Sequence, residues 1–162
     1  MAQAGPVSTP NGIVEALRPP PCARRGAILI VEDRDDVRQG LSQLLEFQGF
    51  LVFEARDFDQ TFEQLESSPQ GIALILLDLN LPGPGGAQIR TRQLATPALC
   101  AIPAIVVSAV GSDVPGAAAL MAAGWLEKPY RFDQLLEHVR RFVVPEGSDT
   151  LPMAHPVPLP EA

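Results

Sequence analysis

Five side chains with acidic, hydroxyl or amine chemistry follow directly after short strand-like segments of the chain: Glu32, Asp33, Asp78, Ser108 and Lys128. Because the carboxyl ends of parallel strands meet at one edge of a sheet, residues that are far apart in the sequence can become neighbours there. The positions of these residues therefore predict a single site that contains three carboxylates, a hydroxyl group and an ammonium group.

Three carboxylates at one site require a cation. Two carboxylates about 5 Å apart repel each other by about 3 kcal/mol at an effective dielectric constant of roughly 20. Oxygen ligands favour a hard metal, and a small number of carboxylates leaves positions for water and phosphate, so we expect Mg²⁺ as the cofactor. Asp78 would then be the nucleophile for a phosphoryl group, with Lys128 holding its oxygens and Ser108 donating a hydrogen bond to them. The product would be an acyl phosphate on Asp78.

The elements that must position these residues alternate between strand-like and helical patterns. The predicted strands are residues 27–31, 51–54, 72–77, 104–108 and 125–127. Helical spacing of apolar residues predicts helices over or around residues 37–45, 58–65, 87–95, 114–123 and 132–142. Strands that are apolar on both faces and alternate with helices indicate a parallel sheet covered on both sides. The sequence thus predicts a doubly wound α/β fold with five strands and five helices.

Composition and charge exclude several classes of protein. The 162 residues, 46% of them hydrophobic, suffice for one core of ordinary size and leave little room for a second domain. A formal net charge of −7 offers no basic face for a phosphate backbone, so we expect no direct nucleic-acid partner. Apolar runs such as 72–77 are too short to span a bilayer, and the N-terminus lacks the order of a secretory signal. We therefore expect a cytoplasmic protein with no membrane partner.

The two ends of the chain differ in composition from the middle. Residues 1–26 are rich in Pro, Gly, Ala and Ser, and residues 145–162 contain five prolines, at 145, 152, 156, 158 and 160. These compositions predict a disordered leader and a disordered or extended tail on either side of a domain at 27–144. A second interpretation of the tail is a polyproline ligand for the groove of a partner protein.

Residues 27–143 resemble the receiver domains of two-component response regulators. Four motifs carry the resemblance: Ile30-Val31-Glu32-Asp33, Asp78-Leu-Asn-Leu-Pro-Gly-Pro-Gly-Gly86, Ser108-Ala109 and Lys128-Pro129. The resemblance implies a flavodoxin-like strand order, 2-1-3-4-5. It also implies a phospho-accepting domain of two-component or phosphorelay signalling, in which phosphorylation of Asp78 switches protein contacts, rather than an enzyme with turnover.

The resemblance assigns further roles within the predicted site. Mg²⁺ would be held by Glu32, Asp33, Asp78 and the backbone carbonyl of Asn80. Pro129 would follow a cis peptide bond. Trp125, three residues before the lysine, would be the aromatic switch of the family: phosphate would draw Ser108 inward and the indole would follow. The face formed by the fourth helix, fifth strand and fifth helix would change as a result.

Partners also follow from the resemblance. A sensor histidine kinase or a histidine phosphotransfer protein would supply the phosphoryl group. Output would pass to a downstream protein at that same face, to a second copy in a homodimer, or to a histidine in a relay. Two departures from the family pattern concern this face: Met121 occupies the position of the usual glycine after the fourth helix, and Pro115 gives that helix an unusual start.

Two other interpretations remain open at this stage. A phosphatase of the haloacid dehalogenase type also uses an aspartate nucleophile with Mg²⁺, but it needs a second acid two residues later, where this chain has Asn80. A receiver-like scaffold that is never phosphorylated is the other alternative. Phosphatase turnover would support the first, and failure to incorporate phosphate would support the second.

Overall fold

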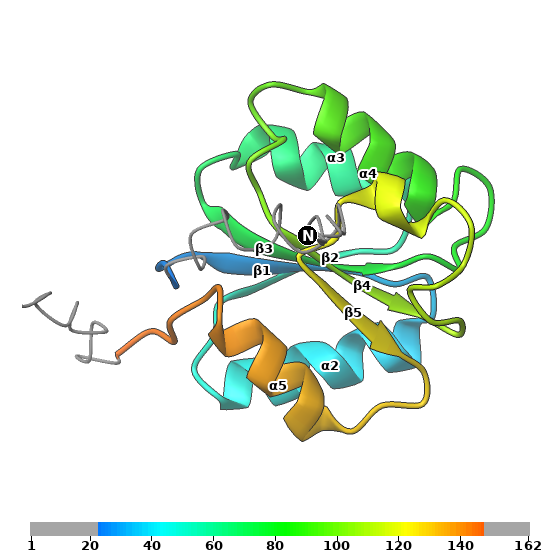
Figure 1. The fold of residues 1–162 in the computed structure, drawn as a ribbon. Helices are drawn as coiled ribbons and strands as arrows, with labels where there is room; N and C mark the ends of the chain where they lie inside the picture. Colours follow the sequence, from blue (N-terminus) through cyan, green and yellow to red (C-terminus); the bar gives the residue numbers. More distant parts are fainter. Residues whose placement is uncertain (1–22, 148–162) are drawn as a thin grey trace, which may run out of the picture.

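Five parallel strands form the centre of the structure, a computed structural model that describes residues 23–147 (Figure 1). They are β1 (Ala27–Val31), β2 (Val52–Ala55), β3 (Ile72–Asp78), β4 (Ala104–Ser108) and β5 (Gly124–Glu127). Their order in the sheet is β2-β1-β3-β4-β5, and every neighbouring pair is parallel. The predicted doubly wound fold and its strand order are therefore confirmed.

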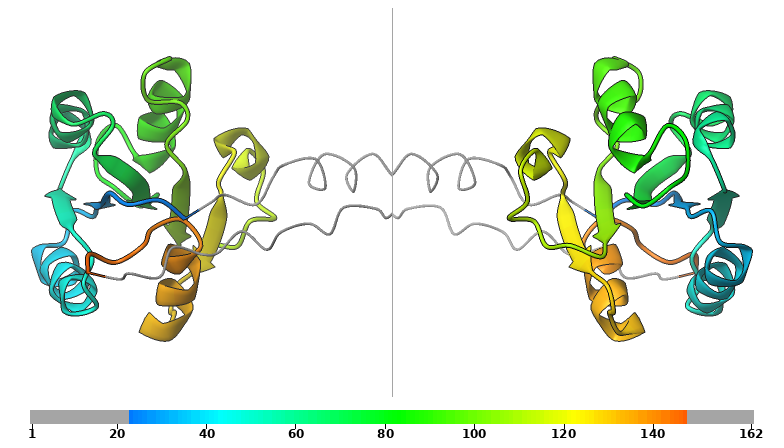
Figure 2. Two further views of the ribbon diagram at one scale, coloured as in Figure 1. Left: turned by 90° about the vertical axis from the view of Figure 1, so that its left-hand side faces the viewer. Right: turned by 90° about the vertical axis from the view of Figure 1, so that its right-hand side faces the viewer.

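Four α-helices and one short 3₁₀ helix connect the strands in the described part of the chain. They are α2 (Asp35–Phe47), α3 (Phe58–Ser67), α4 (Gly86–Ala95), η1 (Ala117–Leu120) and α5 (Phe132–Arg140). Helices α2 and α5 cover one face of the sheet, and α3 and α4 cover the other, as two perpendicular views show (Figures 1 and 2). Helices cover both faces of the sheet because its strands are apolar on both sides and must be shielded from water.

The prediction of five α-helices is wrong at one position. An α-helix was expected over 114–123, but the structure has only the 3₁₀ helix η1 there. Gly116 and Met121, which flank η1, both have left-handed backbone conformations, with φ of 86° and 44°. A right-handed helix cannot contain such residues, and Pro115 supplies no backbone N–H to an additional turn.

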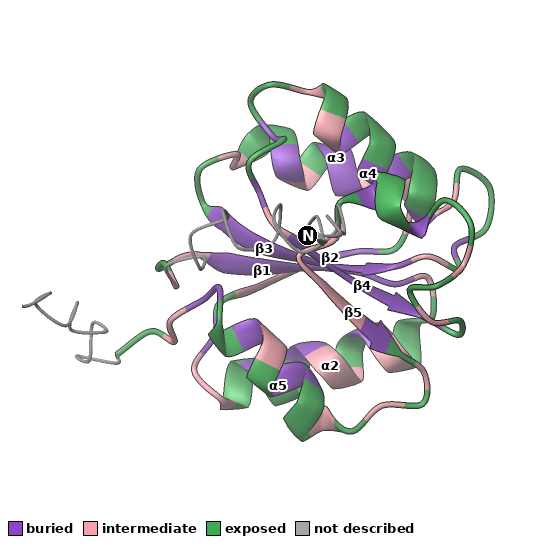
Figure 3. Cartoon of the chain, viewed as in Figure 1, coloured by how far each residue is buried: buried purple, intermediate pink, exposed green. Residues whose placement is uncertain are grey.

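The core consists of two apolar layers, one on each side of the sheet. Strands β1, β3 and β4 are buried along their whole length (Figure 3). One layer includes Leu45 of α2 and Leu135 of α5, and the other includes Leu65 of α3 and Ile89 of α4. Leu44, which belongs to the predicted apolar stripe of α2, instead faces solvent and is 46% exposed.

One glycine sets how α4 meets the sheet. A Cβ atom at Gly86 would lie 2.2 Å from the backbone oxygen of Asp78, so only glycine allows α4 to begin against the end of β3. The contact places the helix start directly beside the residue that the sequence analysis selects as nucleophile.

The described ends of the chain pair with each other. The backbone N–H of Arg24 donates to the carbonyl of Phe142, and the N–H of Val144 donates to the carbonyl of Arg24. Residues 23–26 of the predicted leader and 145–147 of the predicted tail are described, while the rest of both segments lies outside the described residues. Within the described range, no helix has the length and apolar character needed to cross a membrane.

Candidate metal centre

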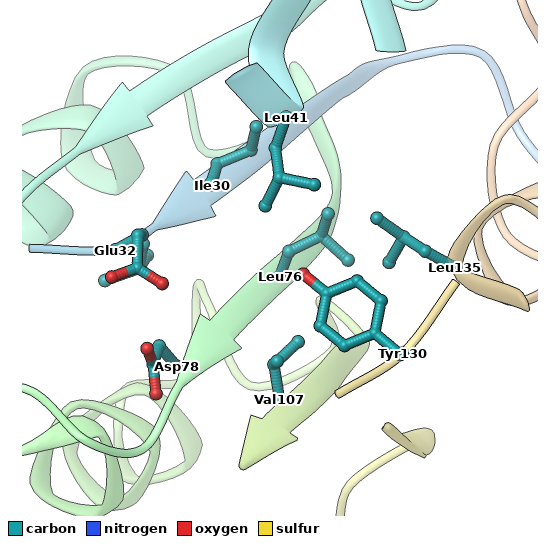
Figure 4. A pocket seen from close by; sticks show the side chains of 9 residues that line it. Ile30, Glu32, Leu41, Leu76, Asp78, Val107, Tyr130 and Leu135 are labelled. Atoms are coloured by element: carbon teal, nitrogen blue, oxygen red, sulfur yellow. The ribbon is translucent and has the colours of Figure 1, made fainter. Parts of the chain in front are cut away.

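Three carboxylates converge at the carboxyl edge of the sheet. Asp78 is the last residue of β3, and Glu32 directly follows β1, whose Val31 pairs with Leu77 of β3. Side-chain oxygens of Glu32, Asp33 and Asp78 all lie within 4.8 Å of one another. Figure 4 shows the carboxylates of Glu32 and Asp78 facing each other from the ends of their strands.

Lys128 brings a positive charge to these carboxylates. Its Nζ lies 2.7 Å from Oδ2 of Asp78 and 3.5 Å from Oε2 of Glu32. The backbone N–H of Lys128 donates to the carbonyl of Ser108 at 2.8 Å, which holds the start of the loop after β5 against β4. The Lys128-Pro129 peptide bond is cis, as expected from the sequence. We call Glu32, Asp33, Asp78 and Lys128 the acidic edge.

Backbone amides complete the hydrogen bonding of the two buried carboxylates. The N–H of Asn80 donates to Oδ1 of Asp78 at 2.8 Å, and the N–H of Arg34 donates to Oε1 of Glu32 at 3.2 Å. Each carboxylate therefore has one oxygen bonded to its own loop and the other directed toward Lys128. The backbone amide of Asn80 thus lies beside the carboxylate of Asp78.

The environment moves the pKa values of the two buried carboxyl groups in opposite directions. Burial, together with the neighbouring Asp78, raises the pKa of Glu32 to about 7. Burial also disfavours ionisation of Asp78, but hydrogen bonds from Lys128 and from the amide of Asn80 outweigh it and hold the pKa of Asp78 below its ordinary value. Asp78 is consequently the group that stays ionised, as a nucleophilic carboxylate must.

The donor set fits a hard divalent cation. Three carboxylates face a single ammonium group, so the acidic edge has an excess of negative charge when all of them are ionised. All of the available ligand atoms are oxygens, which Mg²⁺ and Ca²⁺ prefer over softer metals. A cation between these oxygens would also offset the repulsion from Asp78, which adds to the effect of burial in raising the pKa of Glu32.

Ser108 lies next to the acidic edge and shares a hydrogen-bonding partner, Val110, with Trp125. The Ser108 hydroxyl, at the end of β4, accepts a hydrogen bond from the N–H of Val110 at 3.2 Å. The indole Nε1–H of Trp125, in β5, donates to the carbonyl of the same Val110 at 2.9 Å. A hydroxyl that accepts one hydrogen bond can still donate its own proton. The loop at Val110 thus joins the two residues that were expected to form the switch.

Tyr130 is a neighbour of the site that was not predicted from the sequence. A small hollow, with room for about one water molecule, lies behind the carboxylates and is lined by Glu32, Asp78 and Tyr130 together with apolar residues. The hydroxyl group of Tyr130 points into this hollow (Figure 4). Burial raises the pKa of Tyr130, with the nearby carboxylates adding to the shift. Its position directly after Lys128-Pro129 could have indicated this proximity.

Residues 28–140 match the family model described as the response regulator receiver domain. The chain belongs to this family. Over 125 residues it is 32% identical to the sensory transduction protein RegX3 of Mycolicibacterium smegmatis, an alignment that covers 76% of this chain and 52% of that protein. It is 34% identical over 127 residues to KdpE, the KDP operon transcriptional regulatory protein of Escherichia coli, with 77% and 54% covered. The receiver domain thus spans about half the length of the curated relatives it matches.

Solved structures show the same fold. A sensor protein from Polaromonas superposes with a TM-score of 0.66 at 28% identity, covering 74% of this chain and 96% of that one. The chemotaxis protein CheY4 of Vibrio cholerae superposes with a TM-score of 0.65 at 23% identity, covering 74% and 100%. With these relatives, the chain is a receiver domain of two-component signalling, and the haloacid dehalogenase interpretation is not supported.

Proposed function

We propose that this receiver domain accepts a phosphoryl group on Asp78 in a Mg²⁺-dependent reaction. The observation that carries the proposal is the contact of Asp78 Oδ2 with Lys128 Nζ at 2.7 Å, within a cluster of three carboxylates. An ionised carboxylate can act as a nucleophile, and an ammonium group beside it can stabilise the negative charge of the phosphoryl oxygens.

The reaction is a displacement at phosphorus. A carboxylate oxygen of Asp78 forms a bond to phosphorus while the phosphorus–nitrogen bond of a donor phosphohistidine breaks, and the electron pair remains on the imidazole. Lys128 stabilises charge on the phosphoryl oxygens, and the Ser108 hydroxyl donates a hydrogen bond to them. Glu32, Asp33, Asp78 and the backbone carbonyl of Asn80 would hold Mg²⁺. When bound, the cation would supply positive charge that offsets the negative charge of the reacting groups.

A sensor histidine kinase or a histidine phosphotransfer protein is the proposed phosphodonor. RegX3 and KdpE are named as a sensory transduction protein and a transcriptional regulator, but this chain aligns with only about half of each. We assign output to a protein contact or homodimer at the surface of η1, β5 and α5, or to relay toward a histidine. The cytoplasmic location remains a prediction.

The proposed switch connects the site to that surface through Val110. When a phosphoryl group draws the Ser108 hydroxyl inward, the hydrogen bond to the Val110 amide changes, and with it the carbonyl that binds the Trp125 indole. Since Trp125 is the only tryptophan, its fluorescence reports this change directly. Emission that is indifferent to both Mg²⁺ and a phosphoryl analogue would contradict the coupling.

Mass spectrometry tests the central proposal. After incubation with acetyl phosphate and Mg²⁺, the intact protein should gain the mass of one phosphoryl group, and removal of Mg²⁺ with EDTA should prevent the gain. Asp78→Asn should abolish the modification, whereas Asp59→Asn, a change at an exposed aspartate on α3, should leave it intact. A folded wild-type protein that gains no phosphate from this donor or from a kinase would instead support the scaffold interpretation.

A further inference from the structure

Arg38 is a buried cation beside the acidic edge, and the proposed phosphorylation reaction does not use it. It lies in the second turn of α2, and its side chain is only 10% exposed. Burying a guanidinium group is unfavourable unless its N–H donors are paired, so the contacts of Arg38 indicate what the burial achieves.

The guanidinium of Arg38 joins three elements of the fold. Its Nε donates to Oε2 of Glu54 in β2 at 3.0 Å, and one terminal nitrogen bonds the carboxylate of Asp35 at the start of α2. The other terminal nitrogen donates to the backbone carbonyl of Glu32 at 2.9 Å. Because the guanidinium is planar and rigid, three simultaneous contacts fix its orientation as well as its position.

The bond to the Glu32 carbonyl matters because Glu32 and Asp33 lie in the short connection between β1 and α2. A strand ladder holds β1 up to Val31, and the backbone N–H of Glu32 donates to the carbonyl of Ala55. Beyond that bond, the carbonyl of Glu32 is held by a side chain, that of Arg38. The contact therefore holds the peptide group that joins Glu32 to Asp33.

We propose that Arg38 is a positioning residue for the cation site: by holding the Glu32 carbonyl, it fixes the backbone that presents the Glu32 and Asp33 carboxylates to Mg²⁺. Arg38 acts through this backbone and makes no bond to the cation itself. The inference rests on the proposed Mg²⁺ site and adds a residue on which its affinity depends.

The charge of Arg38 makes the inference testable, because positioning and electrostatics predict opposite signs. A positive charge near the carboxylates disfavours a second cation, so loss of the charge alone should tighten Mg²⁺ binding. Loss of positioning should weaken Mg²⁺ binding. Groups that orient metal ligands typically contribute about 10-fold to 100-fold in metal affinity.

Arg34 provides a matched control in the same connection. Its side chain is 66% exposed and pairs with Asp36, while only its backbone N–H bonds Glu32. Arg34→Met therefore removes a charge from the same loop without removing a bond to the Glu32 carbonyl. Arg38→Lys forms a complementary variant, because it retains the charge but cannot make three planar contacts.

The experiment is a titration of the full chain with MgCl₂, followed by NMR through the amide signal of Asn80, which bonds Asp78. We expect the Mg²⁺ dissociation constant to rise about 10-fold or more in Arg38→Met, and by a smaller factor in Arg38→Lys. Arg34→Met should bind Mg²⁺ as tightly as the wild type or more tightly. The spectra also report whether each variant is folded, and if Arg38→Met is not, Arg38→Lys decides the question.

Two outcomes overturn the inference, and they can be told apart. If the wild type binds Mg²⁺ and the folded Arg38 variants bind it as tightly as Arg34→Met, Arg38 has only a structural role and the proposed phosphorylation site is unaffected. If the wild type itself does not bind Mg²⁺, the proposed function fails together with the inference.

Discussion

The acidic edge and the segment between β4 and β5 are neighbours in the structure, yet they are held in different ways. At the acidic edge, main-chain hydrogen bonds extend the sheet ladder: Leu79 N–H donates to the carbonyl of Val107, and Lys128 N–H donates to that of Ser108. In residues 109–123, by contrast, the chain has only the short helix η1, with a left-handed residue at each end.

The side chain of Arg90 holds the C-terminal end of residues 109–123 in place. Arg90 of α4 donates from Nε to the carbonyl of Leu120 at 2.8 Å and from a terminal nitrogen to that of Met121 at 2.9 Å. Strand register thus positions the chemistry, whereas local turn conformations and one buried arginine shape the adjoining surface. The two regions are therefore held by different kinds of contact, and the following predictions use that difference in order of decreasing effect.

Lys128→Met should have the largest effect, and only on the chemistry. It removes the ammonium group 2.7 Å from Asp78, so we expect phosphorylation by acetyl phosphate to slow by about 100-fold to 1000-fold, the range seen when one stabilising donor is lost. Intact mass spectrometry over time measures the rate. Arg131→Met removes an exposed cation nearby that pairs with Asp133 and should leave the rate unchanged. Equal rates in the wild type and Lys128→Met would remove Lys128 from the mechanism.

Gly86→Ala should disturb the acidic edge through the backbone. The added Cβ would meet the Asp78 carbonyl oxygen at 2.2 Å, and we expect a loss of about 3 kcal/mol in the free energy of unfolding, measured with urea. Gly40→Ala is the matched control in α2. There an added Cβ would meet no heavy atom within 4 Å among the described residues, so a gain of about 0.5–1 kcal/mol is expected. A tolerated Gly86→Ala would mean that α4 can shift away from β3.

When Mg²⁺ is absent, the free energy of unfolding should vary with pH because Glu32 is buried beside Asp78. Glu32 has a pKa raised from 4.5 to about 7, so the folded state binds its proton more tightly than the unfolded state. Stability from this group is present below pH 4.5 and is lost as the pH rises toward about 7, a change of about 1–3 kcal/mol. Asp78, whose pKa is lowered, acts in the opposite direction: its contribution is lost on acidification below its ordinary value of 3.8.

Urea unfolding between pH 4.5 and 7 in EDTA measures the effect of Glu32. In Glu32→Gln, the free energy of unfolding should decrease less over this pH range, because the amide does not titrate. Saturating Mg²⁺ should also oppose the decrease in the wild type, since a cation stabilises the ionised carboxylates. A wild-type decrease that persists unchanged in Glu32→Gln would assign it to another group.

Met121→Gly should have the smallest effect, and only on the 109–123 segment. Met121 has φ of 44° and is 53% exposed, so glycine relieves a left-handed conformation while little packing is lost. We expect the free energy of unfolding to rise by about 1 kcal/mol, with no change in the phosphorylation rate. Ala119→Gly, at an exposed position in η1, should instead lower it by about 0.5–1 kcal/mol. If Met121→Gly slowed phosphorylation, the backbone conformation at Met121 would also influence the acidic edge.

Much of the acidic edge was predictable because its residues follow apolar strands. A short run such as 72–77, apolar at every position and flanked by helical patterns, is typical of a strand in a sheet covered on both sides, and its end then determines where Asp78 lies. The same logic placed Glu32 and Lys128, and their convergence within hydrogen-bonding or ion-pairing distance followed from the parallel topology. The roles of these residues in phosphorylation remain proposals.

Residues 109–123 were predicted less well because apolar spacing alone does not determine a helix. The alanines of this segment have high helix propensity, but Pro115 and the left-handed Gly116 interrupt the pattern, and only a 3₁₀ turn forms. The departure of Met121 from the usual glycine pointed to this segment beforehand. Its left-handed backbone shows why glycine suits the position.

By itself, the sequence determined the order of the elements, the parallel sheet and the strand ends at which acidic and basic residues emerge, since these depend on periodicity and burial along the chain. Only the tertiary structure decided that Arg38 reaches the carbonyl of Glu32, that Val110 binds both Ser108 and Trp125, and that Tyr130 faces the hollow behind the carboxylates. These contacts join elements far apart in the chain or depend on the path of a loop. They are set by how side chains pack in space, which no local pattern of residues records.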